Sequence, residues 1–339
     1  MQAVSLCDDV TVRVDGTAEN GAENRADENG AAKDRADEDG AADWCLPSNI
    51  SVSIETDDAF IAGQRIPADG RNTAYRAVEE FFKIGKISGK TLGRAIPREV
   101  GVHIYKRIPA GAGLAGGSAD AAGALAALNV LCGPLSDADL SAAALNVGAD
   151  VPFCLRFGVG PGYGIGAGPD PGLGVTLGHG IGAGPGPGGG RPCRTAFAAG
   201  VGERLAGLGG RRAACAAVLA NPRFEISTAE VFNNFVLPGE NELRELSKLT
   251  LAMIESIKLS EGAGYGRCFN VLERPATVRY PQIGLIKKRL LETGAFCAAM
   301  SGSGPTVYGL FHETGAARAA ADAIRKSGYW ASVCTTPPA

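Results

Sequence analysis

A glycine-rich string in the first half of the chain is the part of the sequence best suited to chemistry. It reads PAGAGLAGGSA over residues 109–119. The alternating run at residues 102–108 is typical of a strand, which Pro109 ends because proline donates no ladder hydrogen bond. A helical pattern follows, with Ser118 as its expected N-cap and leucines at three-residue spacing. The sequence therefore predicts a glycine-rich loop at a helix N-terminus, where free backbone N–H groups and the helix dipole can hold a phosphate.

Three alternative roles for this loop are less consistent with its residues. Gly111, Gly113 and Gly116 fit the dinucleotide pattern G-x-G-x-x-G, but no convincing acidic residue closes a second strand about twenty residues further on. The Walker pattern is absent, since no Lys-Ser or Lys-Thr follows the glycines. Small residues could also serve only the close packing of a helix on a sheet. Six small residues at positions 111–117, interrupted by Leu114 alone, are more than close packing requires.

Asp150 is the second candidate, in the string GADVPF at residues 148–153. A helix is predicted from Ser136, its N-cap, to about residue 147, with Gly148 as its stop. A carboxylate between that stop and the apolar run after it is expected to be half-buried and fixed. The residues alone favour a cap of the following turn over a catalytic role.

Two further stretches carry polar groups at the ends of predicted elements. Asn72 precedes a predicted helix, where asparagine is a preferred N-cap. The apolar side of that helix comprises Ala74, Val78, Phe81 and Phe82. The string SGSG at residues 301–304 is a second glycine-rich turn, between two β-type runs. Its hydroxyl and backbone donors suit an anionic or polar ligand.

The composition argues against several classes of protein. The formal net charge is −3 and there is no basic run or aromatic-interleaved patch, so nucleic acid is not an expected partner. No segment has the length and apolarity of a membrane span, and no signal-like pattern follows Met1. The nine cysteines, an odd number without a C-x-x-C pair, are expected to be reduced and mostly buried thiols of a cytoplasmic protein.

Two low-complexity segments interrupt the foldable sequence. Residues 17–43 repeat Ala, Gly, Asp, Glu, Asn and Arg, so we expect a solvated insertion at a hairpin tip, with a short marginal helix as the alternative. Residues 158–194 are so rich in Gly and Pro that we expect neither helix nor strand there. His179, in that second segment, is expected to be exposed rather than a metal ligand.

Four strings in order along the chain resemble the motifs of the GHMP kinases, most closely those of the branch that acts on a cytidine diphosphate-linked methylerythritol. They are PAGAGLAGGSADAA, GADVPF, ISTAEVF and SGSGPTVYGLF, beginning at residues 109, 148, 226 and 301. The string NVLE, from Asn270, is similar to the family's Asn-Asp-Leu-Glu. Two residues depart from the family's loop, since Ala115 replaces a usual glycine and Ala119 a usual serine. The resemblance covers essentially the whole chain apart from the two low-complexity segments.

The resemblance implies an α+β fold of two domains, ribosomal-protein-like in the N-terminal domain and ferredoxin-like in the C-terminal domain. The first is expected over residues 1–157, including the insertion at 17–43, and the second over 195–339, with an insertion at 158–194 between them. In the family, a β-hairpin with a lysine and a Tyr-His pair precedes the segment with which this sequence begins. We therefore expect Met1 to be an internal methionine of a longer protein.

The reaction that the resemblance implies is transfer of the γ-phosphate of ATP, with Mg²⁺, to the 2-hydroxyl of 4-diphosphocytidyl-2-C-methyl-D-erythritol in non-mevalonate isoprenoid synthesis. Asp150 is then the catalytic base, and no protein ligand of the metal is assigned. The implied substrate contacts are Thr228, Phe232, Ser301 and Gly302, where Phe232 stacks on the cytosine ring unless it packs in the core. The implied nucleotide contacts are Asn72, Lys106, Pro109, Ala110, Gly111, Ala112, Gly113, Leu114, Ala115, Gly116, Gly117, Ser118 and Ala119. Ser118 is expected at the phosphates or the metal.

Two alternatives stay open at the level of sequence. One is a catalytically impaired homologue that binds a nucleotide but transfers little phosphate. The other is a kinase of the same family for another small alcohol, such as mevalonate or homoserine. A monomer or a weak dimer is expected in either case.

Overall fold

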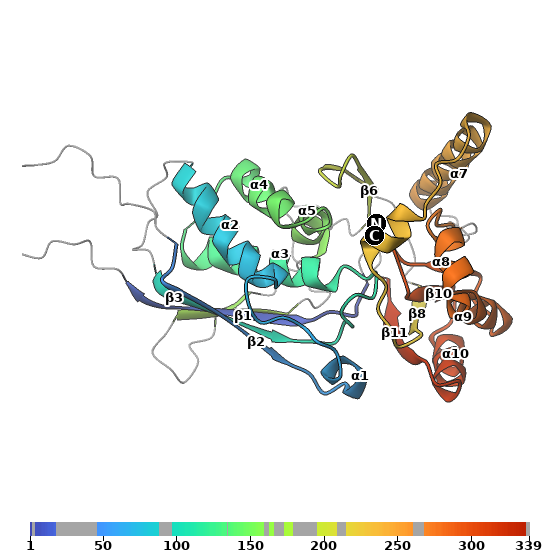
Figure 1. Ribbon diagram of the computed structural model, residues 1–339, viewed down its shortest axis with the longest axis horizontal. Coiled ribbons are helices and arrows are strands. Elements are labelled where there is room, and N and C mark those ends of the chain that lie inside the picture. The colour runs from blue at the N-terminus through green and yellow to red at the C-terminus, as the bar shows by residue number, and fades with distance from the viewer. Residues whose placement is uncertain are drawn as a thin grey trace, which may run out of the picture.

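The computed structural model describes residues 1, 4–17, 46–87, 97–133, 135–158, 163–165, 173–178, 195–208, 215–259 and 268–336. Two domains of mixed helix and strand lie side by side (Figure 1), so the predicted two-domain α+β fold is confirmed. Residues 18–45, which hold nearly all of the first low-complexity segment, and His179 lie outside the described residues. No helix among the described residues combines the length and apolarity needed to cross a bilayer.

A five-stranded sheet in the order β2-β3-β1-β5-β4 forms the base of the N-terminal domain. β1 (Asp9–Thr17) pairs antiparallel with β3 (Pro97–Tyr105), and β2 (Asn49–Glu55) pairs parallel with β3. Val10 and Val12 are fully buried, as the alternating pattern of β1 predicts. β1 and β2 do not form the hairpin whose tip the sequence predicts, because β3 lies between them.

The Gly/Pro-rich segment contributes two strands, so the prediction that it forms none is also wrong. β5 (Leu173–Gly178) pairs antiparallel with β1, from Asp9 opposite Gly178 to Val14 opposite Leu173. β4 (Tyr163–Ile165) then pairs with β5. The string LGVTLG contains no proline, so each of its residues can donate to a ladder, and its Leu-Val-Leu alternation suits a pleated strand.

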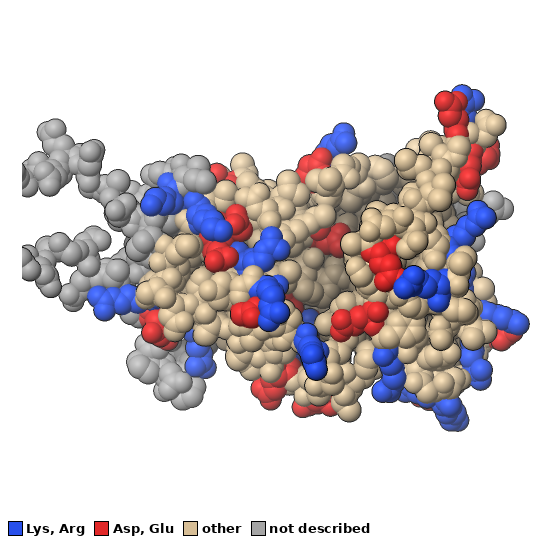
Figure 2. Space-filling model, in the orientation of Figure 1, with Lys and Arg blue, Asp and Glu red and all other residues tan. Residues whose placement is uncertain are grey.

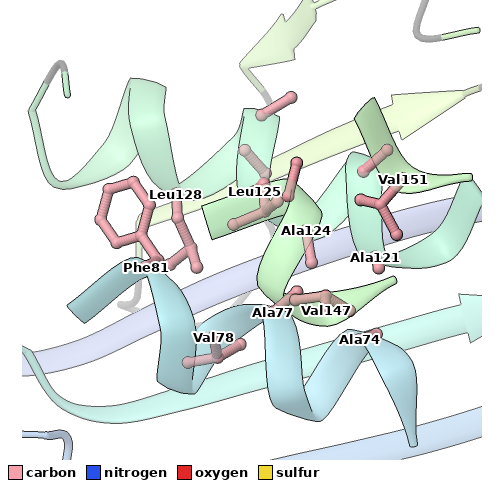
Figure 3. Packing of buried hydrophobic residues seen from close by; sticks show 14 of the residues in the cluster. Ala74, Ala77, Val78, Phe81, Ala121, Ala124, Leu125, Leu128, Val147 and Val151 are labelled. Atoms are coloured by element: carbon pink, nitrogen blue, oxygen red, sulfur yellow. The ribbon is translucent and has the colours of Figure 1, made fainter. Parts of the chain in front are cut away.

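Helices cover one face of this sheet (Figure 1): α2 (Thr73–Ile87), α3 (Gly116–Leu131) and α4 (Asp137–Val147). Figure 3 shows their buried side chains meeting, with Ala74, Val78 and Phe81 of α2 against Ala121, Leu125 and Leu128 of α3. The many alanines of α3 let the helices approach closely. The predicted limits of α4 are confirmed, since Ser136 accepts a capping hydrogen bond from the Asp139 N–H and Gly148 follows the last turn.

The C-terminal domain has a four-stranded antiparallel sheet in the order β11-β8-β10-β9. Its strands are β8 (Ala216–Asn221), β9 (Cys297–Met300), β10 (Val307–Phe311) and β11 (Trp330–Thr335). Its helices are α6 (Thr228–Asn233), α7 (Glu240–Leu259), α8 (Glu273–Arg279), α9 (Pro281–Glu292) and α10 (Thr314–Lys326). The first strand thus lies between the fourth and the third, which is the ferredoxin-like arrangement that the resemblance implied.

Several short elements complete the fold. α1 (Ala59–Ala62) follows β2, and α5 (Val151–Phe153) leads into a π-helical turn at Cys154–Gly158. β6 (Ala196–Ala199) and β7 (Arg204–Gly207) form a small antiparallel pair, and Ala196 packs in the N-terminal core.

The expectation that all cysteines are reduced needs correction. Cys268 and Cys297 form a disulfide, so this pair is oxidised. The two residues are 29 apart in sequence, and only the packing of residue 268 beside β9 brings them together. Among the other described cysteines, Cys132, Cys154 and Cys334 are buried, as expected.

Candidate active site

The described surface is hollowed between the two domains (Figure 2), where a cavity of about 660 Å³ lies. Three parts of the chain singled out from the sequence reach this cavity: the first glycine-rich loop through Gly113 and Leu114, Asp150, and the second turn through Ser301 and Gly302. These residues come from both domains. The cavity therefore brings together residues of these three segments, while Ser118, Gly111 and Gly116 do not line it.

The first loop has an unusual backbone. Gly111 and Gly113 have φ of +59° and +71°, and Ala115 has φ of +55°, all in the left-handed region. Ala115 is the N-cap of α3, which begins at Gly116, and makes no side-chain capping hydrogen bond. The prediction that Ser118 is the N-cap is therefore wrong, because the left-handed turn at Ala115 starts the helix three residues earlier. Since no N-cap side chain occupies the first-turn N–H groups, they remain able to bind an anion.

Ser118 instead lies within the first turn of α3 and is half-buried. Its hydroxyl makes no hydrogen bond to any residue that the structure describes. A hydroxyl in the first turn of a helix, beside unpaired amides, can contact a phosphate or its metal ion.

The two glycine-rich turns touch each other. The Ser301 hydroxyl donates to the Gly113 carbonyl at 2.8 Å, and the Thr306 N–H donates to the Ala112 carbonyl at 3.3 Å. A Cβ on Gly113 would lie 2.4 Å from the Ser301 carbonyl oxygen, so only glycine fits. Because the Ser301 hydroxyl donates its proton to the Gly113 carbonyl, it can only accept a hydrogen bond from a ligand.

Lys106 lies behind the loop rather than on its open side. Its side chain is 3% exposed, and its ammonium pairs with Asp8 at 2.5 Å and with Asp120 at 2.8 Å. The same ammonium is 3.4 Å from where a Cβ on Gly116 would stand. Burial alone lowers the pKa of Lys106, but attraction to Asp120 and Asp8 outweighs it and raises that pKa. The lysine is thus a buried cation beneath the start of α3.

Asp120 completes this buried group. Burial raises the pKa of Asp120, while Lys106 opposes the rise. One of its carboxylate oxygens, Oδ1, has no hydrogen-bond partner among the described residues. Buried ion pairs of this kind are sensitive to the removal of one partner, since the remaining charge is left uncompensated.

Asp150 does not cap the turn that follows it. It stands at the N-cap position of α5, but its side chain makes no capping hydrogen bond, so the capping interpretation is wrong. Asp150 lines the cavity and is exposed, so the expectation that it is half-buried is wrong. Partial desolvation by the neighbouring protein raises the pKa of Asp150. A carboxylate that caps no helix and is more basic than usual can act as a general base.

Asn72, another nucleotide candidate, has its side-chain amide engaged in hydrogen bonds within the protein. Its Oδ1 accepts from the Ala74 N–H at 2.8 Å and its Nδ2 donates to the Pro67 carbonyl at 2.7 Å. This arrangement is the helix cap that the sequence offered as one interpretation. The next residue, Thr73, donates to the Gly117 carbonyl at 2.6 Å and so ties α2 to the loop.

The substrate candidates of α6, Thr228 and Phe232, do not line the cavity. The Thr228 and Ser303 hydroxyls are 2.9 Å apart and form a hydrogen bond. The side chain of Phe232 is 56% exposed, so the core-packing interpretation of this residue is wrong. An exposed ring on this helix is free to stack on a planar ligand.

Two polar residues that sequence reasoning missed shape the second turn. Asn270 donates from Nδ2 to the carbonyls of Met300 and Gly302, at 2.9 and 2.7 Å. Glu273 accepts from the Met300 N–H at 2.9 Å. The similarity of NVLE to a family string marked this region, but no local pattern indicates that its polar side chains hold a turn 30 residues away.

No group of three or more His, Cys, Asp or Glu side chains among the described residues is arranged to hold a metal ion. Mg²⁺ commonly takes most of its ligands from substrate phosphates and water, with only one or two protein carboxylates. The Ser118 hydroxyl and the Asp150 carboxylate are oxygen donors of the type that Mg²⁺ accepts.

Comparison with known proteins identifies the family. A family model described as the GHMP kinases N terminal domain matches residues 72–158, and one described as GHMP kinases C terminal matches residues 253–329. The fold and the site thus define a GHMP kinase. A 4-diphosphocytidyl-2-C-methyl-D-erythritol kinase of Pelotomaculum thermopropionicum is 34% identical over 288 residues, which is 84% of this chain and 79% of that protein. One from Geobacter sulfurreducens is 32% identical, over 80% of this chain and 78% of that protein.

Solved structures give the same result. A crystal structure of 4-(cytidine 5'-diphospho)-2C-methyl-D-erythritol kinase matches with a TM-score of 0.51 and 27% identity, over 85% of this chain and 84% of that one. Homoserine kinase from Cytophaga hutchinsonii has a TM-score of 0.55 at 18% identity, over 85% and 82%, and shows the shared fold alone. The chain belongs to the 4-diphosphocytidyl-2-C-methyl-D-erythritol kinase family.

Proposed function

We propose that this protein transfers the γ-phosphate of ATP to the 2-hydroxyl of 4-diphosphocytidyl-2-C-methyl-D-erythritol. One observation carries the proposal: in a chain of this family, Asp150 and both glycine-rich turns open onto one cavity. Phosphoryl transfer asks the protein mainly for positioning and for compensation of negative charge. A loop of free amides and a nearby base meet those two requirements.

Each part of the site has a role in this mechanism. The first-turn N–H groups of α3 and the loop from Gly111 to Ala115 hold the phosphates of ATP, and the Ser118 hydroxyl adds a further donor. Asp150 accepts the proton of the attacking hydroxyl and orients it, and its raised pKa makes it a stronger base than an ordinary aspartate. Mg²⁺, bound with the nucleotide, would supply positive charge at the phosphates, with Ser118 as its protein contact.

The substrate is held at the second turn and α6. Gly302 and the accepting oxygen of Ser301 face the cavity and suit the polar tail of the substrate. Thr228 stands beside this turn through Ser303, and the exposed ring of Phe232 offers a stacking surface for the cytosine. Stacking of a base on an aromatic side chain is worth roughly 1–3 kcal/mol.

The setting of the reaction follows from the same family. We expect a cytoplasmic enzyme, active as a monomer or a weak dimer, that does not bind nucleic acid. On the face shown in Figure 2, Lys and Arg side chains are scattered among acidic ones rather than gathered into one patch, which supports that last expectation.

The deciding experiment measures ADP release from Mg·ATP with and without the cytidyl substrate. Release that depends on this substrate supports the proposal. Release that depends on mevalonate or homoserine instead would replace the substrate while keeping the reaction. ATP binding by calorimetry, run in parallel, separates a third result: binding without any release identifies a nucleotide-binding homologue that lacks transfer.

A further inference from the structure

Gln64 holds the entrance of the first glycine-rich loop. Its Oε1 accepts from the Ala110 N–H at 2.8 Å, and its Nε2 donates to the Ala110 carbonyl at 3.0 Å. One side-chain amide therefore satisfies both polar backbone groups of Ala110, as a neighbouring strand would. Such a pair fixes the peptide planes on both sides of Ala110, immediately before the left-handed turn at Gly111.

The same amide reaches the other domain. Nε2 of Gln64 also donates to Oε1 of Glu225, at 3.1 Å. Glu225 lies in the segment between β8 and α6 of the C-terminal domain. It also touches the loop, because a Cβ on Gly111 would lie 3.0 Å from its Cγ. Gln64 thus joins the loop entrance to a residue of the second domain.

The segment that carries Gln64 is itself attached to the C-terminal domain. Asp58 caps α1 with Oδ1 and accepts from the Trp330 indole N–H with Oδ2, at 2.8 Å. The Arg223 guanidinium lies over the Phe60 ring, 5.6 Å from its centroid. Together with the Gln64–Glu225 contact, these interactions tie α1 and the residues after it to β11 and to the segment between β8 and α6. A shift of the C-terminal domain would therefore move Gln64.

We infer that Gln64 is a positioning residue for the phosphate loop, and that Glu225 couples this positioning to the placement of the C-terminal domain. The loop can bind phosphate only if its N–H groups converge, and Ala110 sets the direction in which the chain enters it. Gln64 itself does not reach the cavity. The nucleotide part of this inference rests on the proposed function, whereas the hydrogen bonds to Ala110 do not.

The test compares Gln64→Ala with Gln282→Ala, a change of the same type at an exposed position of α9. The readouts are hydrogen exchange of residues 108–112 and equilibrium binding of Mg·ATP. We expect exchange in this segment to rise and ATP affinity to fall by roughly tenfold in Gln64→Ala only, since two neutral hydrogen bonds contribute energy of that order. KM for ATP should rise with kcat changed less.

A pair of complementary variants tests the coupling to Glu225. Gln64→Glu keeps the acceptor for the Ala110 N–H but places a carboxylate against both the Ala110 carbonyl and Glu225. Adding Glu225→Gln supplies an amide that can donate to the new carboxylate. We expect Gln64→Glu to weaken ATP binding and the double variant to recover part of the loss, as a non-additive double-mutant cycle.

Folded Gln64→Ala with unchanged exchange at residues 108–112 and unchanged ATP affinity would overturn the inference. A double variant whose effects merely add would remove the coupling to Glu225 but leave the contact with Ala110. If the wild-type protein releases no ADP with the cytidyl substrate, the proposed function fails. Hydrogen exchange of residues 108–112 and Mg·ATP binding would still test the role of Gln64.

Discussion

The Ser301 hydroxyl donates to the Gly113 carbonyl at 2.8 Å across 188 positions of the sequence. The bond joins the phosphate loop of one domain to the second glycine-rich turn of the other. Asn270 donates to the carbonyls of Met300 and Gly302 and so fixes the second turn. The bond between Ser301 and Gly113 therefore connects two preformed pieces of backbone. The cavity wall therefore depends on how closely these two turns approach.

Gly113→Ala tests that approach. The added Cβ would lie 2.4 Å from the Ser301 carbonyl oxygen, and φ of +71° is itself unfavourable for alanine. We expect the free energy of unfolding to fall by at least about 1–2 kcal/mol, with loss of ATP binding. Denaturant unfolding and calorimetry measure the two effects. Gly239→Ala, where a Cβ meets nothing within 4 Å, is the control and should leave both nearly unchanged.

Asp150→Asn tests the base. The amide keeps the size and position of the side chain but cannot accept the proton of the attacking hydroxyl. We expect kcat to fall by about 10²–10⁴, the usual contribution of a general base, while Mg·ATP binding stays within about twofold. Steady-state kinetics with the cytidyl substrate gives the first quantity and calorimetry the second. A variant with wild-type kcat would remove Asp150 from the mechanism.

The pH profile tests the environment of Asp150. Partial desolvation by neighbouring protein raises the pKa of this carboxyl group, although the residue is exposed to the cavity, so it becomes protonated at a higher pH than an ordinary aspartate. The acidic limb of kcat/KM should therefore lie above pH about 3.9, the usual aspartate value. The folded state holds this proton more tightly than the unfolded state. The protonated group therefore stabilises the fold at low pH, and this contribution is lost as pH rises from the ordinary aspartate pKa through the raised pKa. Asp150→Asn should lose this part of the pH dependence of unfolding.

Lys106→Met tests the buried ion group. Removing the ammonium leaves Asp8 and Asp120 without their cation, and breaking a buried pair in this way costs about 3–5 kcal/mol. The loss should shrink at acidic pH, because the pKa of Asp120 rises further when Lys106 no longer opposes burial. Lys288→Met, which removes an exposed ion pair to Glu292 at 3.7 Å, should change stability by less than about 1 kcal/mol. Equal effects of the two changes would contradict the assigned burial.

Ala115→Gly tests the departure from the family's loop. An alanine at φ of +55° is strained by roughly 1–2 kcal/mol, and glycine relieves that strain at the expense of a more flexible unfolded chain. We expect a net gain in the free energy of unfolding of about 1 kcal/mol or less. Ala319→Gly, inside the exposed face of α10, should lower stability by about 1 kcal/mol. The opposite signs distinguish a backbone effect from a general effect of glycine.

Features with local signals can be predicted from the sequence. Ser136 and Gly148 mark the ends of α4 because caps act within one helical turn. The buried side of α2 follows from the spacing of Ala74 and Phe81. The glycine-rich loop is recognisable, yet the pattern predicts Ser118 as its cap wrongly, because an alanine in a left-handed conformation leaves no mark in the sequence.

Features that depend on distant partners cannot be predicted in this way. Gln64 has no motif of its own, and its role exists only through Ala110 and Glu225, which are 46 and 161 positions away. The bond between Cys268 and Cys297 likewise needs the folded C-terminal domain. The family resemblance assigns Lys106 to the nucleotide, but its buried position depends on Asp8, 98 positions earlier.

The pairing of β5 with β1 has a consequence for solubility. Without β5, β1 would be the outermost strand of its sheet, with a row of unpaired N–H and C=O groups and the apolar Val10 and Val12 along it. Exposed edges of this kind are templates for aggregation. A Gly/Pro-rich stretch that looks dispensable in sequence thus shields the central strand from pairing between molecules.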